Sequence, residues 1–413
     1  MMMKNMLTWR AIAPLFLILL LDALSFGLIL PELGKLFLND TRLLGTGTPT
    51  IVRDILYSVT ISLPLFGMLF GAPLLGSLSD SVGRKQTLLF SLLGCALCFL
   101  GSAISIVVGS VVLLLLSRLV LGVLNGNESI AQAAIADLHN KNTANKAISM
   151  SLISLGGSVG FVIGPLLGGY FSDSTLCHWF NYQTPFYVAA VLCLLSAGML
   201  YLFFQETHTP TKTQFRWQQS FESLWFAFTR PEFRYIACMY FCMEFAWGLY
   251  FQSISLLLLL GHGFSTHEIG SFMTYIAVCF MFTLLTLIRL LHKRFTSHTV
   301  VIIGMLLLGL GGFCTLISPT TGNVLITAFF TTVGVGVTYN TLLALFSNAA
   351  HAAHQGHAMG MAVSIGAIAW ILAALLSGIL SGVNLYLPYI LIGVMGMVGV
   401  GFAFKAKLND YAQ

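Results

Sequence analysis

The chain has 413 residues, of which 57% are hydrophobic and only 8% are charged. About a quarter of the residues are charged in an average soluble domain, so this composition excludes a soluble globule whose surface needs a polar cover. The formal net charge is +5, but the basic residues are scattered singly or in pairs between apolar runs. This pattern predicts a lipid bilayer as the partner and argues against a nucleic acid.

Apolar runs of about twenty residues, the length with which an α-helix crosses a bilayer, recur along the chain. Because backbone groups must pair internally in lipid, we expect an all-α integral membrane protein with twelve spanning helices. The first six spans lie near residues 11–33, 55–76, 87–107, 111–133, 147–171 and 185–204. The second six lie near residues 233–260, 268–290, 298–317, 323–348, 358–380 and 385–404.

A polar stretch divides these spans into two sets. It predicts an N-terminal six-helix bundle over 1–204, a cytoplasmic linker over 205–232 and a C-terminal six-helix bundle over 233–413. Two pseudo-symmetric bundles are typical of secondary transporters. Lys and Arg gather in the loops on one side, so we expect both termini to lie in the cytoplasm. We expect a multi-pass protein of the plasma membrane, in a bacterial inner membrane.

The first span carries Asp22 at its centre and continues to Pro31 without a cleavage site of small residues. It is therefore interpreted as a retained helix and not as a secretory signal. Asp22 and Glu244, in the seventh span, lie at similar depths in counterpart helices, and both are expected to face a shared central cavity.

The break after the second span reads GSLSDSVGRK from Gly76 to Lys85. Gly76 and Gly83 allow sharp turns, Asp80 can bond exposed amides or a partner helix, and Arg84 with Lys85 holds the loop in the cytoplasm. The pattern resembles the signature loop between the second and third helices of the major facilitator superfamily. We favour this interpretation over an ordinary positively charged turn.

Two details of this resemblance bear on a cytoplasmic gate. Ser81 stands where the family usually has arginine, which leaves one expected salt bridge in doubt. Asp137, at the cytoplasmic end of the fourth span, is expected either to pair with Arg84 across the gate or to stay solvated at its helix end.

The fourth span also carries Arg118, followed by Gly122 and Gly126 at four-residue steps, which resembles a further pattern of the superfamily. A guanidinium inside a membrane span is costly unless it faces water or an acid, so Arg118 is a functional candidate. A buried salt bridge that holds helices together is the structural alternative.

The fifth span is rich in glycine. Its small residues and its proline are Gly156, Gly160, Gly164, Pro165, Gly168 and Gly169. Glycines at four-residue spacing form a stripe against which another helix can pack backbone to backbone. With its Gly-Pro, the stripe resembles the antiporter motif of the drug-proton antiporters, and the first span is similar to that of the tetracycline-resistance exporters. The resemblance implies export, and a general packing face is the alternative.

Asp22, Arg118, Glu128 and Glu244 are the candidates for proton and substrate binding. Loss of water favours the neutral form of a carboxyl group, and a nearby cation favours its charged form, so proton and solute can compete for one site. Structural hydrogen bonds are the alternative role for each carboxylate.

Two other patterns are given structural interpretations. Cys95 and Cys98 form a C-x-x-C inside a continuous apolar run, where packing is the favoured role. His351, His354 and His357 recur every third residue in a cytoplasmic loop without accompanying cysteine or carboxylate, so we favour a polar loop and predict no metal site.

The leading hypothesis is a monomeric proton-coupled exporter of a hydrophobic or amphipathic small molecule, with the proton gradient as its energy source and no cofactor. The alternative is a transporter of an anionic metabolite or carboxylate-type siderophore in either direction, with Arg118 as the partner of the anion. No nucleophile elbow, phosphate-binding loop or metal-ligand cluster appears in the sequence, so we do not expect an enzyme.

Overall fold

The computed structural model describes residues 2–38, 43–138, 143–173, 176–207, 228–317, 320–349 and 355–406. Within these ranges the chain consists of helices joined by turns, with no strand. Eleven segments of the described chain are long and apolar enough to cross a membrane, and Val159–Phe171 is a shorter apolar helical segment. The predicted all-α membrane architecture is confirmed.

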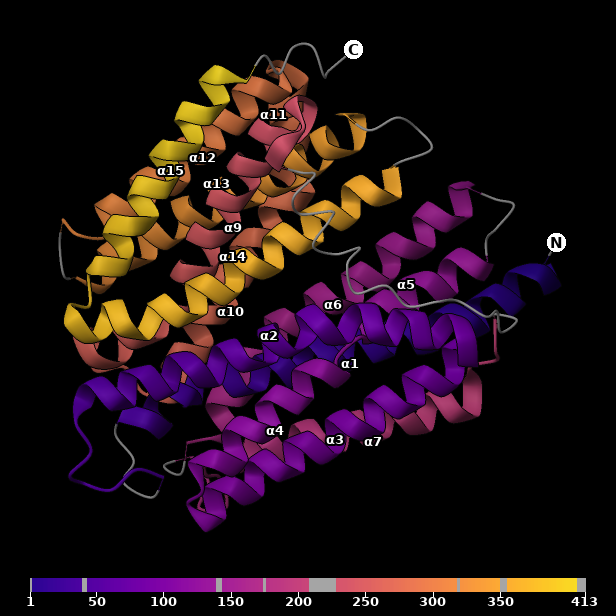
Figure 1. Cartoon of the computed structure of the whole chain (residues 1–413), viewed down its shortest axis with the longest axis horizontal. Helices are drawn as coiled ribbons and strands as arrows, with labels where there is room; N and C mark the ends of the chain where they lie inside the picture. Colours follow the sequence, from indigo (N-terminus) through magenta and orange to yellow (C-terminus); the bar gives the residue numbers. More distant parts are fainter. Residues whose placement is uncertain are drawn as a thin grey trace. The chain divides into compact units, whose positions relative to one another are not determined.

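Figure 1 shows the helices in chain order, with the first half of the sequence in indigo to magenta. The helices of this half are α1 (Met2–Leu38), α2 (Thr50–Val82), α3 (Arg84–Val108), α4 (Val111–Leu124), α5 (Asn127–Leu138), α6 (Thr143–Phe171) and α7 (Thr184–Phe203). Those of the second half are α9 (Pro231–Leu256), α10 (Thr266–Phe282), α11 (Ile288–Arg294), α12 (Ser297–Cys314), α13 (Thr321–Ala349), α14 (Gln355–Val383) and α15 (Leu387–Lys405). π-helical turns, Leu257–Gly261 and Thr283–Leu287, follow α9 and α10.

The predicted fourth span is not one continuous helix. It divides into α4 and α5 at Asn125 and Gly126, where short turns replace the regular helical ladder. In the break, the carbonyl oxygen of Leu124 accepts a hydrogen bond from the amide of Gly126 at 3.1 Å, and the Ser91 hydroxyl of α3 lies 2.5 Å from the same oxygen. Irregular backbone is tolerated at membrane depth where protein groups replace the missing hydrogen bonds.

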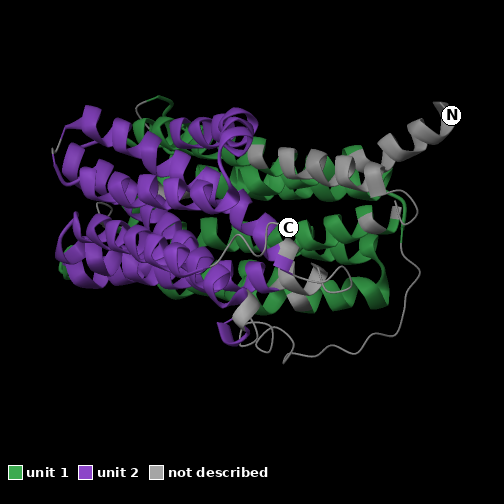
Figure 2. Ribbon diagram, turned by 90° about the horizontal axis from the view of Figure 1, so that it is seen from above, with its two compact units in different colours: residues 1–49, 63–215, 265–274 green, residues 50–62, 216–264, 275–413 purple. Residues whose placement is uncertain are grey.

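The chain forms two compact units, shown in green and purple in Figure 2. Unit 1 comprises residues 1–49, 63–215 and 265–274, and unit 2 comprises residues 50–62, 216–264 and 275–413. The first turns of α2 therefore belong with the second half of the sequence, and the start of α10 belongs with the first half. Most of the predicted linker, residues 208–227, lies outside the described residues, so its bounds stay a prediction.

Each unit has a tightly packed interior. In unit 1, buried side chains of five helices meet in one cluster, among them Leu15 of α1, Leu75 of α2, Leu88 of α3, Ile130 of α5 and Leu200 of α7. In unit 2, α12 packs against α13 and α15. A Cβ atom added to Gly312 of α12 would lie only 2.9 Å from the amide nitrogen of Gly393, so these backbones approach as closely as only small residues permit.

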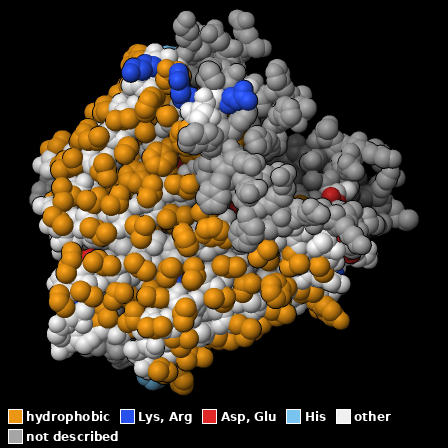
Figure 3. Space-filling view, viewed as in Figure 1, with side chains coloured by type: hydrophobic (Ala, Val, Ile, Leu, Met, Phe, Trp, Pro, Cys, Tyr) orange, Lys and Arg blue, Asp and Glu red, His pale blue; other side chains and the backbone are white. Residues whose placement is uncertain are grey.

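The outer surface is apolar, as a lipid environment requires. Figure 3 shows hydrophobic side chains spread across the described part of one face, with Lys and Arg gathered at one end. Large exposed hydrophobic residues include Leu97, Val108, Leu202 and Phe404, each about two-thirds or more exposed. A soluble monomer rarely exposes contiguous apolar area of this kind, which is consistent with lipid contact.

Candidate functional site

The loop between α2 and α3 is reduced to one residue, Gly83. Its φ of 115° lies in the left-handed half of the backbone map, which favours glycine. The amide of Gly83 closes α2 on the carbonyl of Ser79, and α3 begins at the next residue. This turn directs the side chains that precede and follow it to one place.

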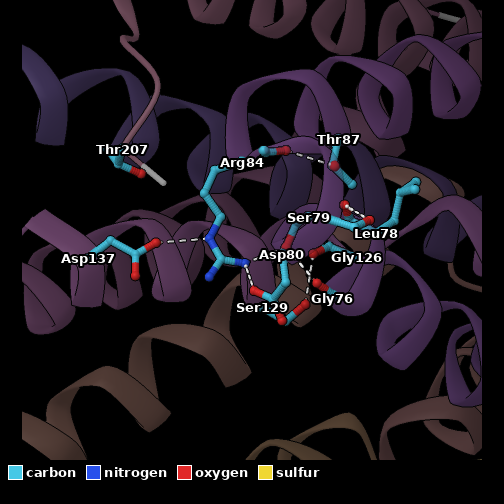
Figure 4. A network of polar contacts seen from close by, with 12 residues as sticks. Gly76, Leu78, Ser79, Asp80, Arg84, Thr87, Gly126, Ser129, Asp137 and Thr207 are labelled. Atoms are coloured by element: carbon cyan, nitrogen blue, oxygen red, sulfur yellow. Dashed lines mark hydrogen bonds and ion pairs between the residues drawn. The ribbon is translucent and has the colours of Figure 1, made fainter. Parts of the chain in front are cut away.

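Arg84 is the centre of a polar network at this turn, drawn in Figure 4. Its Nη1 atom lies 2.6 Å from Asp80 Oδ1 and 2.5 Å from Ser79 Oγ, and its Nε atom lies 3.0 Å from Asp137 Oδ2. Arg84 is 6% exposed, so these charge-assisted contacts are largely shielded from water. The predicted pairing of Asp137 with Arg84 is confirmed, and it joins α5 to the α2–α3 turn.

Glu206, just after α7, caps the start of α3, which the sequence did not reveal. Its carboxylate oxygens accept hydrogen bonds from the backbone amides of Arg84 at 2.9 Å and Lys85 at 3.0 Å. The first amides of a helix lack partners within the helix, and a negative charge there is favoured by the helix dipole. An acidic residue directly after an apolar span was the available signal, but its partners lie more than a hundred residues away.

Asp22 of α1 is bound to the break between α4 and α5. Asn127 donates a hydrogen bond from Nδ2 to Asp22 Oδ1 at 3.0 Å, and its Oδ1 atom lies 2.7 Å from the Ser91 hydroxyl. Asn127 is fully buried. Sequence reasoning selected Asp22 but missed Asn127, because an amide at the start of a helix is usually a local cap.

Glu128 follows Asn127 and is exposed on α5. Gln132 donates to Glu128 Oε1 at 3.1 Å, one helical turn along. Glu128 is also close enough to Asp22 for their negative charges to repel. The structure thus brings two of the four candidate residues together within unit 1.

Arg118 lies on α4 and is only 3% exposed. One turn later, Gly122 contacts α2, where an added Cβ would meet the carbonyl of Pro64. A second turn later, Gly126 lies in the helix break, and an added Cβ would meet the side chain of Leu75 at 2.8 Å. The two glycines of the R-x-x-x-G pattern therefore serve close packing against α2, beside a buried guanidinium.

The glycine stripe of α6 packs on α1 along its whole length. Added Cβ atoms at the four glycines of the stripe would meet backbone oxygens of α1 at matching four-residue steps: Gly156 at Phe16, Gly160 at Leu20, Gly164 at Leu24 and Gly168 at Leu28. The predicted backbone-to-backbone packing face is confirmed, and its partner is α1.

The remaining residues of the motif have other neighbours within unit 1. An added Cβ at Gly169 would lie 2.5 Å from the carbonyl oxygen of Thr266, at the start of α10. Pro165 meets Gly27 of α1, where an added Cβ would lie 2.8 Å from Pro165 Cδ. The motif therefore presents one surface to α1 and another to the first turn of α10.

In unit 2, Glu244 of α9 is a buried acid. It is 6% exposed, and the indole Nε1 of Trp370 on α14 donates to its Oε2 atom at 2.7 Å. The Tyr240 side chain, one turn earlier on α9, lies beside Glu244. Across from the carboxylate lies Gly366, where an added Cβ would be 3.8 Å from Glu244 Cδ. Trp370 and Tyr240 were not selected from the sequence, since aromatic residues are abundant throughout the chain.

The remaining patterns carry no further site in the described structure. Cys95 and Cys98 are free and buried. His351, His354 and the side chain of His357 lie outside the described residues. Among the residues that are described, no group of three or more His, Cys, Asp or Glu side chains is placed to hold a metal ion.

Comparison with known proteins decides the family. The model of the Major Facilitator Superfamily matches residues 5–374 and 236–410, which together cover nearly the whole chain. The chain belongs to the Major Facilitator Superfamily. It is therefore a membrane transporter of this superfamily and not an enzyme.

The curated relatives match about half of this chain. The class H tetracycline resistance protein of Pasteurella multocida is 32% identical over 203 residues, which are 48% of this chain and 45% of that protein. Major facilitator superfamily domain-containing protein 10 of Bos taurus is 32% identical over 222 residues, 49% of this chain and 46% of that protein. The matched segment thus spans about half the length of these relatives.

Solved structures of the superfamily share the fold over nearly the full length. The crystal structure of the human organic anion transporter MFSD10 (TETRAN) superposes with a TM-score of 0.70 at 20% identity, covering 95% of this chain and 99% of that one. A D-xylose-proton symporter superposes with a TM-score of 0.76 at 16% identity, covering 96% and 97%. At these identities the likeness establishes the fold.

Proposed function

We propose that this transporter is a proton-coupled exporter of a hydrophobic or amphipathic small molecule, with Glu244 as the coupling carboxyl group. The observation that carries the proposal is the environment of Glu244, which is buried at 6% exposure and hydrogen-bonded by the neutral donor Trp370. A carboxylate inside a membrane protein is costly and marks a proton or substrate pathway by default.

The donor explains how such a group can hold either charge state. An indole N–H stabilises the carboxylate without a permanent charge of its own, so a proton can bind without first breaking a salt bridge to this donor. A cationic or polarised solute near Glu244 would favour the charged form, and its departure would favour the protonated form. Competition of this kind couples proton entry to solute release.

Relatives that are named as resistance proteins support export. Besides the tetracycline resistance protein of Pasteurella multocida, the multidrug resistance protein MdtG of Dickeya zeae is 30% identical over 188 residues, 46% of this chain and 42% of that protein. The glycine stripe against α1, which resembles the antiporter motif, supports the same direction.

Transport of an organic anion is the second candidate. It is favoured by Arg118, a guanidinium buried at 3% exposure, and by the likeness to the organic anion transporter MFSD10. An arginine held away from water is well suited to bind a carboxylate through two parallel hydrogen bonds.

Reconstituted proteoliposomes with an internal pH indicator test both candidates. When a lipophilic cation such as ethidium, or tetracycline, is added to vesicles that contain the intact protein, protons should cross the membrane. Glu244→Gln should abolish this proton movement, whereas Glu268→Gln, which changes an exposed carboxylate at the start of α10, should leave it unchanged. Proton movement by Glu244→Gln at the rate of the intact protein would overturn the assignment of Glu244.

The same vesicles separate the anion candidate. Flux of an anionic dye such as carboxyfluorescein, with loss of that flux in Arg118→Ala and no response to the lipophilic cation, would favour anion transport. Asp22→Asn reports whether the carboxyl group of Asp22, held by Asn127, also takes part in proton movement.

We further infer a monomer in the plasma membrane, in a bacterial inner membrane, with both termini in the cytoplasm. The Lys and Arg bias of the predicted loops supports this orientation. Protease accessibility of tags at the two ends in sealed vesicles tests it, and light scattering in detergent tests the monomer.

A further inference from the structure

The first turns of α2 attach this helix to unit 2, while the rest of α2 belongs to unit 1. Tyr57 donates from its hydroxyl to the carbonyl oxygen of Gln252 on α9 at 3.1 Å. One residue later, the Ser58 hydroxyl accepts a hydrogen bond from the backbone amide of Gly378 on α14 at 2.9 Å. These polar contacts hold the first turns of α2 close to the backbones of α9 and α14.

Asp54 lies one turn before Ser58 and is the unusual member of this contact. It is 3% exposed, and its Oδ2 atom occupies the space that a Cβ atom on Gly382 of α14 would fill. Within the described structure, Oδ2 is fully buried and has no hydrogen-bond partner. The carboxyl group is thus pressed against a helix backbone that offers it no donor.

A negative charge in this position would be strongly unfavourable. Burial strips an ionised carboxylate of its water, and this loss is offset only where the charge is paired and hydrogen-bonded. A protonated carboxyl group has no charge to bury, so it does not need a cation among its neighbours. The packed arrangement of Asp54 and Gly382 is therefore suited to the neutral acid.

Among the described residues of unit 2, the groups that contact this part of α2 do not supply a compensating charge. The elements packed against this face contribute Gln252 of α9 and Gly378 and Gly382 of α14, which are neutral. Tyr57, the titratable group beside it on α2, already donates to a carbonyl. Arg53 is the adjacent charged residue, but successive side chains of a helix diverge by about 100° and do not face each other.

We propose that Asp54 is a proton-binding site and that its protonated form holds the end of α2 against α14. The carboxylate takes one proton from water, the neutral acid packs on Gly382, and release of the proton weakens this contact. By the predicted topology this end of α2 is on the non-cytoplasmic side, so the proton comes from outside. The site is distinct from Glu244, and it stands whether or not Glu244 couples transport.

The sign of the pH dependence follows directly. Because the neutral form is the packed form, the contact is strongest at low pH and weakens as the pH rises through the titration of Asp54. At pH values above this titration, the equilibrium constant for separation of the first turns of α2 from α14 should change about tenfold for each pH unit, as for any step linked to one proton.

Hydrogen–deuterium exchange of the intact protein in nanodiscs measures this opening without labels. Exchange in peptides covering residues 50–62 and 374–384 is compared at pH 5.5 and pH 8.0 after correction for the intrinsic pH dependence of amide exchange. We expect at least tenfold weaker protection at pH 8.0. Asp54→Asn, a neutral group of the same shape, should keep the protection of pH 5.5 at both values.

Two further variants sharpen the result. Glu268→Gln removes an exposed carboxylate and should behave like the intact protein. Gly382→Ala should lower the protection at pH 5.5, because the new methyl group takes the space of the Asp54 carboxyl group. Protection of residues 50–62 that is equal at both pH values in the intact protein would overturn the proposal, even if Asp54→Asn fails to fold. A pH dependence that persists in a folded Asp54→Asn variant would overturn it as well.

Discussion

Two glycines of α6 that lie three residues apart should respond in opposite ways to the same substitution. A methyl group added at Gly160 would meet the carbonyl oxygen of Leu20, with the amide nitrogen of Leu24 at 2.9 Å. Both are backbone atoms, which cannot swing aside as a side chain can. A methyl group added at Gly157 would have no atom within 4 Å. Gly157→Ala is therefore a matched control on the same helix.

The expected difference follows from packing. Overpacking of a close contact costs about 1 to 3 kcal/mol. Replacement of glycine by alanine in a helix contributes about 0.5 to 1 kcal/mol of stability, but this gain is common to both variants and cancels in their difference. At roughly 2 to 4 °C per kcal/mol for domains of 150 to 250 residues, the unfolding midpoint of Gly160→Ala should lie about 2 to 12 °C below that of Gly157→Ala.

Thermal unfolding in detergent, followed with a thiol-reactive fluorogenic dye, measures this difference because cysteines such as Cys95 and Cys193 are buried in the folded protein. The intact protein should unfold between the two variants, or close to Gly157→Ala. Equal midpoints for Gly157→Ala and Gly160→Ala would refute the assignment of the stripe to the contact with α1.

Three further substitutions have defined outcomes. Glu206→Ala removes the acceptor of two α3 amides and should lower stability by about 0.5 to 2 kcal/mol, with a smaller loss in Glu206→Gln, as read from unfolding midpoints. Asp137→Ala removes one of the ion-pair partners of Arg84 and should increase protease cleavage near the end of α5, and unchanged cleavage would argue against a gate contact. Trp370→Phe keeps the ring but deletes the donor to Glu244, so proton movement in vesicles should fall while folding persists, and full activity would count against this hydrogen bond.

Local sequence patterns determined much about this protein. Apolar runs of bilayer length specify spanning helices, since a helix satisfies its own backbone within one segment. The turn at Gly83 and the charges beside it follow from a few neighbouring residues. The stripe of α6 was also readable as a packing face, because a four-residue period places glycines on one side of a helix wherever that helix lies.

Only the tertiary structure decided which residues meet. The bonds from Asn127 to Asp22, from Trp370 to Glu244 and from Glu206 to the start of α3 each join residues more than a hundred positions apart. No local period encodes such pairs, since they depend on which helices become neighbours. The break at Asn125 was hidden for the same reason, because the Ser91 hydroxyl that compensates it comes from another helix.

The assignment of the first turns of α2 to unit 2 shows most clearly what the sequence alone does not determine. By its sequence α2 is one continuous apolar helix, yet residues 50–62 pack with α9 and α14 in unit 2. Asp54 lies just before the predicted second span, 55–76, and was not selected from the sequence. Its burial against Gly382, more than three hundred residues later, follows from the packing of whole helices, which sequence spacing alone does not determine.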